Sequence, residues 1–271
     1  MNKHLIALDL DGTLLYDWST LDQNTKDFLL EFKQLGHPLV IATGRPFRSA
    51  IKFYRELKLN TPIINYNGGL ISWPGNEDFK GVDIKLEKDA VIDIFKANEA
   101  HIENAFCEIK DDIYLMKESE DIVDLLHFFN NARLFVGDFK KTLPGPVNGF
   151  IIVGKKDKGH HIENYVKRHY PNKIMARNWG DDHQFIIELY SPQNNKGMAL
   201  DYVAKHYDIP RENVIAFGDG LNDLEMIQYA GIGVAVKNAC PELKELADVV
   251  SPHSNQQQAI KKFLKKYFKD K

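Results

Sequence analysis

Residues 5–13 read LIALDLDGT, an apolar strand that ends in two acids. Alternate residues of a strand point to the same side, so Asp9 and Asp11 are expected to face one spot while Leu10 turns away. Gly12 permits a sharp turn directly after them. Two carboxylates crowded at the end of a buried strand repel each other and raise each other's pKa values unless a cation lies between them. The pattern is typical of a magnesium site with a carboxylate nucleophile, and an ordinary acidic turn is the simpler alternative.

The 271 residues suffice for one large domain or two modest ones, with apolar and charged fractions typical of a globular protein. The formal net charge of −3 gives no field that would attract nucleic acid or an anionic membrane. Cys107 and Cys240 are too few for a disulfide framework or a metal cluster. No apolar run approaches a membrane span and the first strand begins too early for a signal peptide, so we expect a cytoplasmic protein. The lysine-rich end, residues 260–271, has helical spacing and is expected to be a solvated surface helix.

Two parts of the chain alternate strand and helix. The first part predicts strands over about 4–10, 37–42 and 61–65, with helices over about 22–35 and 46–59. The second predicts helices over 195–207, 221–229, 240–246 and the C-terminal end, with strands over 213–217, 231–236 and 248–250. The strands are apolar throughout rather than alternating, as in a parallel sheet covered on both faces.

The region between these parts reads differently. The pattern predicts helices near 87–101, 118–130 and 159–169, and strands near 105–109, 112–116, 149–154, 173–178 and 184–190. A connection punctuated by glycine and proline is expected over 131–148. Paired helices with adjacent short strands are typical of an α+β domain with an antiparallel sheet. We therefore predict an α/β core of residues 1–82 and 191–271, into which an α+β domain of residues 83–190 is inserted.

Two further segments place functional side chains at helix starts. Residues 42–46, ATGRP, follow an apolar strand, and Thr43 and Gly44 with free backbone N–H groups would form an anion site there, or else a simple N-cap. In residues 193–197, QNNKG, Lys196 falls in the first helical turn, where a cation opposes the helix dipole. Such violations cluster at functional sites. Lys196 therefore needs an anion, unless it simply extends into solvent.

Residues 217–223, FGDGLND, form a glycine-rich and acidic strand end. Asp219 leaves the strand tip, and Asp223 lies one helical turn later and can face the same site. The third glycine of a G-x-G-x-x-G dinucleotide loop would fall at position 223, so this is not such a loop. Acid in place of glycine indicates a site that binds a cation first and a phosphate through it, with a polar turn as the alternative.

All these segments lie at predicted carboxyl ends of core strands, where open α/β sheets bind ligands. The candidate side chains among them are four acids (Asp9, Asp11, Asp219 and Asp223), the hydroxyl of Thr43, Lys196 and Asn222. Hard oxygen ligands at few positions suit Mg²⁺, which keeps waters and phosphate oxygens as its other ligands. The sequence therefore predicts a magnesium cofactor and a phosphate-bearing small molecule as ligand, with no nucleic-acid or membrane partner.

The combination resembles the haloacid dehalogenase (HAD) superfamily, and more narrowly the Cof-type phosphatases with a large α/β cap of the C2 type. The resemblance covers the whole chain. Its motifs follow in the family's order: residues 9–13, then Thr43, Lys196, and residues 218–223 with Met226, while residues 65–69, NYNGG, look like the family's asparagine-glycine turn beside the active site. The resemblance implies a Rossmann-like parallel-sheet core and makes residues 83–190 the cap.

The resemblance also implies an activity and a set of roles. It indicates a magnesium-dependent phosphatase that hydrolyses small-molecule phosphate monoesters, such as a sugar phosphate or related metabolite, through an aspartyl-phosphate. Asp9 would be the nucleophile and Asp11 the general acid and base. The remaining roles are Mg²⁺ binding by Asp9, the main chain of Asp11, and Asp219; phosphate binding by Thr43, Gly44, Lys196 and Asn222; and support from Asp223 and Asn67.

Three alternatives stay open at this stage. A phosphomutase of the same superfamily would return the phosphoryl group to a sugar instead of water. A phospho-accepting regulatory protein would use a similar acidic pair, although the chain is long for one. A binding protein with a spent active site is disfavoured because every catalytic position holds a competent residue. The physiological substrate and the oligomeric state are not decided by the sequence.

Two regions carry open questions. Residues 254–259, SNQQQA, stand where the family usually shows an acidic-glycine turn, so their role cannot be borrowed. The inserted domain is expected to act as a lid that chooses the substrate. Residues 177–183, RNWGDDH, form either a recognition loop or a plain hairpin connection. The histidines of this domain match no metal motif and are expected to serve in packing or at the surface: His101, His127, His160, His161, His169 and His183.

Overall fold

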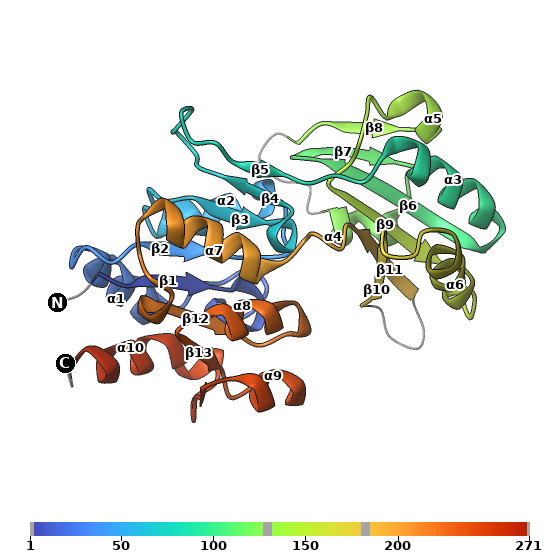
Figure 1. Ribbon diagram of the computed structural model, residues 1–271. Helices are drawn as coiled ribbons and strands as arrows, with labels where there is room; N and C mark the ends of the chain where they lie inside the picture. The colour runs from blue at the N-terminus through green and yellow to red at the C-terminus, as the bar shows by residue number, and fades with distance from the viewer. Residues whose placement is uncertain (1–2, 127–131, 180–184, 270–271) are drawn as a thin grey trace. The chain divides into compact units, whose positions relative to one another are not determined.

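The computed structural model describes residues 3–126, 132–179 and 185–269, and it divides into two compact units (Figure 1). The first unit comprises Met1–Arg45, Ala50–Val82 and Asn195–Lys271. The second comprises Pro46–Ser49 and Asp83–Asn194. In sequence, the second unit therefore interrupts the first, and its main segment begins at the predicted residue 83 and ends four residues after the predicted 190.

A five-stranded parallel sheet forms the centre of the first unit, in the order β14-β13-β12-β1-β2. Its strands are β1 (Leu5–Leu8), β2 (Leu39–Ile41), β12 (Val214–Gly218), β13 (Ile232–Ala235) and β14 (Val249–Val250). β1 lies between β2 and β12, and Leu8 is in register with Phe217. The carboxyl ends of the first strand and of a strand more than 200 residues later are thus neighbours, and the predicted parallel-sheet core is confirmed.

Helices cover both faces of this sheet. They are α1 (Gln23–Lys33), α2 (Phe47–Glu56), α7 (Lys196–His206), α8 (Leu224–Tyr229), α9 (Pro241–Leu246) and α10 (Ala259–Lys269). On one face Ala7 packs in an apolar cluster with Leu200 of α7. On the other face the ring of Phe217 contacts that of Phe263 in α10, with centroids 5.4 Å apart. Burial on both sides explains why these strands are apolar throughout.

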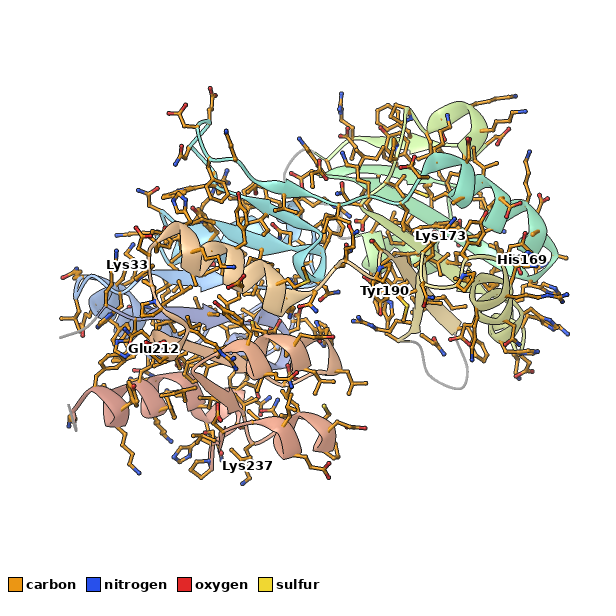
Figure 2. The ribbon with its side chains drawn as sticks, viewed as in Figure 1. Lys33, His169, Lys173, Tyr190, Glu212 and Lys237 are labelled. Atoms are coloured by element: carbon orange, nitrogen blue, oxygen red, sulfur yellow. The ribbon has the colours of Figure 1, made fainter. Side chains whose placement is uncertain are left out.

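A lysine side chain also connects two of these helices by a hydrogen bond. Figure 2 shows Lys33 in the last turn of α1, where its amino group donates to the carbonyl of Leu57, just past the end of α2, over 3.3 Å. A cation at a helix C-terminus complements the helix dipole and the unpaired carbonyls there.

A small antiparallel sheet, β3 (Ile63–Asn65), β4 (Leu70–Ser72) and β5 (Val82–Asp83), completes the first unit. β3 is a strand as predicted, but its ladder partner is β4, and a bridge between Ala42 and Ile64 connects it to the core sheet. The cause is the turn at Tyr66–Gly68, where all three residues have positive φ and reverse the chain.

The second unit contains a six-stranded sheet in the order β10-β11-β9-β6-β7-β8, antiparallel except for the β7–β8 pair. Its strands are β6 (Ile102–Ile109), β7 (Asp112–Leu115), β8 (Leu134–Val136), β9 (Gly149–Gly154), β10 (Met175–Asn178) and β11 (Phe185–Tyr190). Its helices are α3 (Lys88–Asn98), α4 (Val123–Leu126), α5 (Phe139–Thr142) and α6 (Gly159–His169). Apolar side chains of α3 and α6, such as Ile94 and Ile162, form one core with the sheet.

Two predictions for this unit need correction. The connection expected over 131–148 contains β8 and α5 in its described part, because a three-residue exposed strand and a one-turn helix leave little periodicity in the sequence. The helix expected over 118–130 begins as a 3₁₀ turn, Glu120–Ile122, and continues as α4, and its remainder lies outside the described residues. In the part of the chain that the structure describes, no helix is long and apolar enough to cross a membrane.

Candidate active site

Asp9 directly follows β1 instead of ending it. The strand stops at Leu8, and residues Leu10–Leu14 form a single wide helical turn in which Gly12 has φ +71°. The backbone N–H of Asp9 donates to the carbonyl of Phe217 over 3.2 Å, so the residue is fixed at the junction of β1 and β12. Its side chain is buried.

The carboxylates of Asp9 and Asp11 have different partners: Asp9 bonds to Lys196, and Asp11 is not among the acids grouped with Asp9. Asp11 instead pairs side-on with Arg45: Nε donates to Oδ2 over 2.8 Å and Nη2 donates to Oδ1. The alternation of an extended strand ends at Leu8, so two-residue spacing no longer places both acids on one face. The pKa of Asp9 is raised well above its usual value, first by burial and then by the charge of Asp223, so the predicted repulsion from Asp11 is not its main cause.

Lys196 lies in the first turn of its helix, as predicted, and is paired with two carboxylates. It is the first residue of α7, after the N-cap Asn195, and it is fully buried. Its Nζ donates to Oδ1 of Asp9 over 2.7 Å and to Oδ1 of Asp223 over 2.6 Å. Burial alone would lower the pKa of Lys196, but the charges of Asp223 and Asp9 outweigh this effect and raise the pKa. The ammonium group therefore stays charged between two carboxylates.

The strand end after β12 is organised around Asp223 and Asp219. Oδ2 of Asp223 accepts hydrogen bonds from the backbone N–H groups of Asp219 (2.9 Å) and Gly220 (3.0 Å). Oδ1 of Asp219 accepts from the Thr13 hydroxyl over 3.0 Å. Burial, followed by the charge of Asp223, raises the pKa of Asp219 to about 6. A Cβ at Gly12 would lie 2.2 Å from Oδ2 of Asp219, so only glycine permits this approach.

These acids form a group that fits a hard cation. One carboxylate oxygen each from Asp9, Asp219 and Asp223 lie within 4.8 Å of one another. Oxygen donors of this kind suit Mg²⁺. Because Asp223 already uses one oxygen for Lys196 and the other for backbone N–H groups, Asp9 and Asp219 are the better placed side-chain ligands. The Asp11 side chain lies in its ion pair with Arg45, so only the main chain of Asp11 is available for the role predicted for it.

The predicted phosphate-binding residues form a second network. The buried Thr43 accepts at its hydroxyl from the N–H of Arg45 (3.1 Å) and at its carbonyl from the N–H of Asn67 (3.1 Å). Oδ1 of Asn67 accepts in turn from Nδ2 of Asn222 over 2.9 Å. A Cβ at Gly44 would lie only 3.1 Å from that same oxygen. The structure thus brings Thr43, Gly44, Asn67 and Asn222 together, and the Asn222 amide bonds to Asn67.

Residues 254–259, whose role was open, support the turn after Asp9. Nδ2 of Asn238 donates to the carbonyl of Gly12 over 2.7 Å, and the N–H of Asn255 donates to Oδ1 of Asn238 over 3.0 Å. Nδ2 of Asn255 also donates to the carbonyl of Leu15 over 2.8 Å. Nothing in the sequence linked these asparagines to residues more than 220 positions earlier. Thr13 and Arg45, in contrast, stood inside quoted motifs without an assigned role.

The predicted recognition loop is only partly described. Arg177 belongs to β10 and its guanidinium lies 4.8 Å from the ring centroid of Tyr190, which Figure 2 labels. Trp179 follows the strand and is 48% exposed. Residues 180–183, with His183, and also His127, lie outside the described residues. Arg177 therefore lies within the strand predicted near 173–178, and its guanidinium packs on an aromatic ring.

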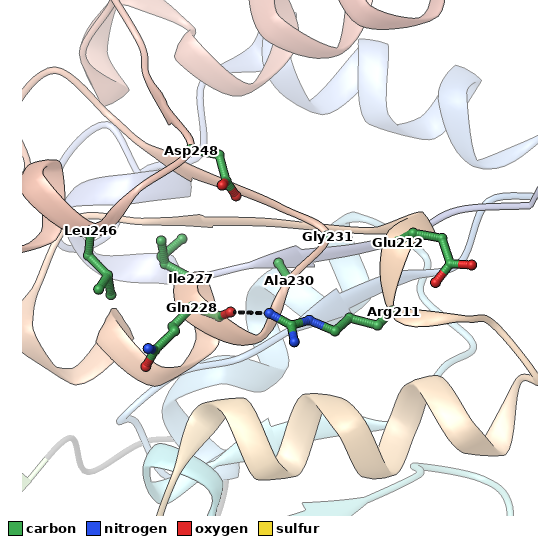
Figure 3. A pocket seen from close by; sticks show the side chains of 8 residues that line it. All are labelled: Arg211, Glu212, Ile227, Gln228, Ala230, Gly231, Leu246 and Asp248. Atoms are coloured by element: carbon green, nitrogen blue, oxygen red, sulfur yellow. Dashed lines mark hydrogen bonds between the residues drawn. The ribbon is translucent and has the colours of Figure 1, made fainter.

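A pocket of about 520 Å³ lies at the other end of the core strands (Figure 3). Its lining includes Arg211, Gly231 and Asp248, which precede β12, β13 and β14, whereas the acids of the candidate site follow β1 and β12. Arg211 spans part of it and donates through Nη2 to the carbonyl of Gln228 over 2.7 Å. The pocket is therefore separate from the carboxylate cluster.

The known proteins that this chain resembles are hydrolases and phosphatases. The sequence matches the family of haloacid dehalogenase-like hydrolases over residues 6–264. A Bacillus subtilis (strain 168) protein named 5-amino-6-(5-phospho-D-ribitylamino)uracil phosphatase YitU is 34% identical over 266 residues, which cover 98% of this chain and 97% of that protein. Phosphatase YwpJ of the same organism is 28% identical over 273 residues, covering 91% of this chain and 94% of the relative. A solved haloacid dehalogenase-like hydrolase from Bacteroides thetaiotaomicron has a TM-score of 0.84 at 27% identity, covering 98% of this chain and 100% of that one.

Proposed function

Because the chain belongs to the haloacid dehalogenase-like hydrolases and is a phosphatase, we propose that it uses Mg²⁺ to hydrolyse small-molecule phosphate monoesters through an aspartyl-phosphate. One observation carries the proposal. A fully buried Lys196 bridges Asp9 and Asp223 at the carboxyl ends of the central strands, with Asp219 in the same cluster. A buried charged cluster of this kind is costly for folding, which supports a functional role.

In the proposed reaction a carboxylate oxygen of Asp9 attacks phosphorus while the bond from phosphorus to the leaving oxygen breaks. The Asp11 carboxylic acid gives its proton to that oxygen. In the second step the Asp11 carboxylate takes a proton from water as the water oxygen attacks phosphorus and the bond to Asp9 breaks. Lys196 and the hydroxyl of Thr43 are proposed to hold the phosphoryl oxygens, and the Asn67–Asn222 pair to shape the pocket around them.

The proposed ligands of Mg²⁺ are the side chains of Asp9 and Asp219 and the main-chain oxygen of Asp11. When bound, Mg²⁺ would offset the repulsion between the Asp9 carboxylate and a phosphate dianion, which at ~4 Å and an effective dielectric of ~20 is about 4 kcal/mol per charge pair. The raised pKa values of Asp9 and Asp219 are the expected property of acids placed to share a cation.

The test is phosphate release with and without metal. We expect EDTA-treated protein to be inactive, Mg²⁺ to restore activity, and Ca²⁺ to restore little, because Ca²⁺ prefers more ligands than this site offers. Asp9→Asn keeps the shape of the side chain. In Mg²⁺ its rate of phosphate release should be several orders of magnitude below that of the parent protein, while its circular dichroism spectrum is unchanged. Full activity in metal-free buffer would refute the metal site, and near-normal hydrolysis by Asp9→Asn would refute the covalent route.

We further propose that residues 83–190 act as a cap that selects the leaving group. The relative of 34% identity is named for a substrate that carries phosphate on a ribityl chain. A phosphorylated polyol or sugar is therefore the first compound for a substrate panel, which should include other phosphate monoesters of similar size.

A further inference from the structure

Arg45 contacts Asp11, the residue proposed as both general acid and general base, through two parallel hydrogen bonds. The two nitrogens Nε and Nη2 grip both oxygens of Asp11, a side-on fork that fixes the plane of the carboxylate as well as its position. The Arg45 side chain is 8% exposed and that of Asp11 is 26% exposed. The acid is thus held on one side and open on another.

The arginine is itself held in place before it reaches Asp11. Its backbone N–H donates to the Thr43 hydroxyl over 3.1 Å, and its carbonyl accepts from Nδ2 of the fully buried Asn65 over 2.9 Å. Its guanidinium lies 5.7 Å from the ring centroid of Phe53. Anchors on the backbone and on the side chain leave the guanidinium few alternatives, which is the condition for a group that orients another.

The same guanidinium also grips the loop after the wide helical turn. Nη2 donates to the carbonyl of Trp18 over 2.6 Å. That loop is closed by Asp17, whose Oδ1 accepts from the N–H groups of Ser19 (2.7 Å) and Thr20 (2.8 Å). Arg45 therefore fixes Asp11 relative to the chain segment that follows it, so the orientation of the carboxylate does not depend on the short turn alone.

We infer that Arg45 is a positioning residue that orients the Asp11 carboxylate for proton transfer to the leaving oxygen and from water. The inference rests on the proposed function, because it needs Asp11 to be the acid and base. A lysine cannot replace the fork, since a single ammonium group does not fix the plane of a carboxylate. Arg45 does not touch the reacting atoms in this role.

The test uses two substrates of nearly the same shape, p-nitrophenyl phosphate and phenyl phosphate. The nitrophenolate ion leaves without a proton, whereas the more basic phenolate needs one. We expect Arg45→Gln to lower kcat/KM for phenyl phosphate about tenfold more than for p-nitrophenyl phosphate, because only the former needs the acid in the first step. Arg45→Lys should show a smaller but still selective loss.

Rapid-mixing kinetics give a second readout. In Arg45→Gln the first step with p-nitrophenyl phosphate stays fast, while hydrolysis of the aspartyl-phosphate slows because Asp11 must take a proton from water. We expect a burst of p-nitrophenolate equal to the enzyme concentration, followed by a slow steady state that is absent in the parent protein. Arg133→Gln is the matched control. Arg133 forms the same kind of fork with Asp112, at a side chain that is 71% exposed, and its loss should change neither readout.

Equal losses on the two esters, or no burst, would overturn the inference and leave Arg45 a structural or phosphate-binding residue. If Arg45→Gln fails to fold, as thermal unfolding would reveal, Arg45→Lys decides by the same two measurements. Failure of the proposed function looks different: the parent protein would release phosphate from neither ester, or Asp9→Asn would remain active.

Discussion

Asp223 uses both carboxylate oxygens to position its neighbours in the site. One oxygen holds Lys196, and the other collects the N–H groups of Asp219 and Gly220. A Cβ at Gly218 would lie 2.6 Å from that of Asp223, so the glycine before Asp219 is required for this arrangement. One buried acid therefore sets the position of the lysine, of the turn backbone and of the neighbouring metal-binding candidate.

The buried His37 is expected to make the free energy of unfolding depend on pH. Its Nδ1 accepts from the N–H of His4 over 3.1 Å, and its ring packs between Phe32 and Phe268. Burial, followed by the charge of His4, lowers the pKa of His37 in the folded protein. Below a pH of about 6.5 the unfolded chain therefore binds a proton that the folded chain resists, so the free energy of unfolding should fall as pH drops through this range.

The measurement is urea unfolding between pH 5 and 8 for the parent protein and for His37→Asn. Asparagine keeps an acceptor for the His4 N–H but does not titrate. It will be less stable throughout because it leaves a void, yet its pH slope below 6.5 should be flatter than that of the parent. Parallel slopes for the two proteins would show that His37 does not contribute.

The sequence predicted which residues form the candidate site better than it predicted where their side chains point. Asp9, Asp219 and Asp223 converge because they follow β1 and β12, and the carboxyl ends of neighbouring parallel strands must meet. Lys196 joins them from the start of α7, where a cation needs a nearby anion. The direction of Asp11 could not follow, because it depends on where β1 ends, to within one residue. Its pairing with Arg45 depends on side chains packed 34 positions apart.

At the scale of elements, the start of α7 carries Lys196 and depends on the turn before β4. Gly68 has φ +98°, and a Cβ there would lie 2.4 Å from the carbonyl oxygen of Asn195, the N-cap of α7. Gly68→Ala must therefore move the helix start and Lys196 with it. We expect kcat/KM to fall about 100-fold, since displacements near 1 Å carry costs of this size.

Gly75→Ala is the matched control for this prediction. Gly75 also has positive φ, +83°, but a Cβ there meets nothing within 4 Å. Both variants pay the backbone cost of roughly 1–2 kcal/mol, and only Gly68→Ala adds the collision. The prediction fails if steady-state kinetics show similar activity for the two variants.

The sheet of the second unit contains a buried ion pair on β6. Glu108 pairs with Arg48, whose side chain is fully buried and also donates to the carbonyl of Leu126 over 2.7 Å. Glu108→Gln removes the charge of the carboxylate that pairs with this buried guanidinium, and we expect the free energy of unfolding to fall by about 3 kcal/mol in urea titrations.

The same strand offers the control. Glu103 pairs with Lys117 over 3.3 Å, but these side chains are 59% and 50% exposed. Glu103→Gln should cost less than about 1 kcal/mol, because exposed ion pairs contribute little. An equal loss in the two variants would contradict the role given to burial.

Helices and strands were predictable from the sequence where burial places apolar residues at a regular spacing over several positions. Helix 159–169 and strand 149–154 have the predicted bounds, because each carries several apolar residues at regular spacing. β8 was missed because its three residues are all exposed and its strand character comes from pairing with β7, a contact that local sequence does not encode.

At the scale of the whole molecule, the proposed division of labour predicts two kinds of variant. Lys196→Ala should lower kcat/KM for every ester together, because it acts on the phosphoryl group that all share. Trp179→Ala, in the unit proposed as the cap, should change the ranking among esters more than it changes hydrolysis of p-nitrophenyl phosphate. The measurement is a matrix of kcat/KM values for both variants over several phosphate esters.

Each half of this matrix can fail separately. A uniform loss in Trp179→Ala would remove this residue from leaving-group selection. A selective loss in Lys196→Ala would contradict its assignment to phosphate.

The first unit is built from distant parts of the chain, and this sets when it can be completed on a ribosome. Asp9 is synthesised 187 residues before Lys196, and Thr13 206 residues before Asp219. At about 5–20 residues per second, roughly 10–40 seconds pass before Lys196 joins Asp9. During that interval all of the second unit is synthesised, while β1 lacks its neighbour β12 and keeps an unpaired edge. A nascent chain that stalls before residue 214 therefore carries Asp9, the proposed nucleophile, without Asp219 and Asp223, and with a strand edge open to aggregation.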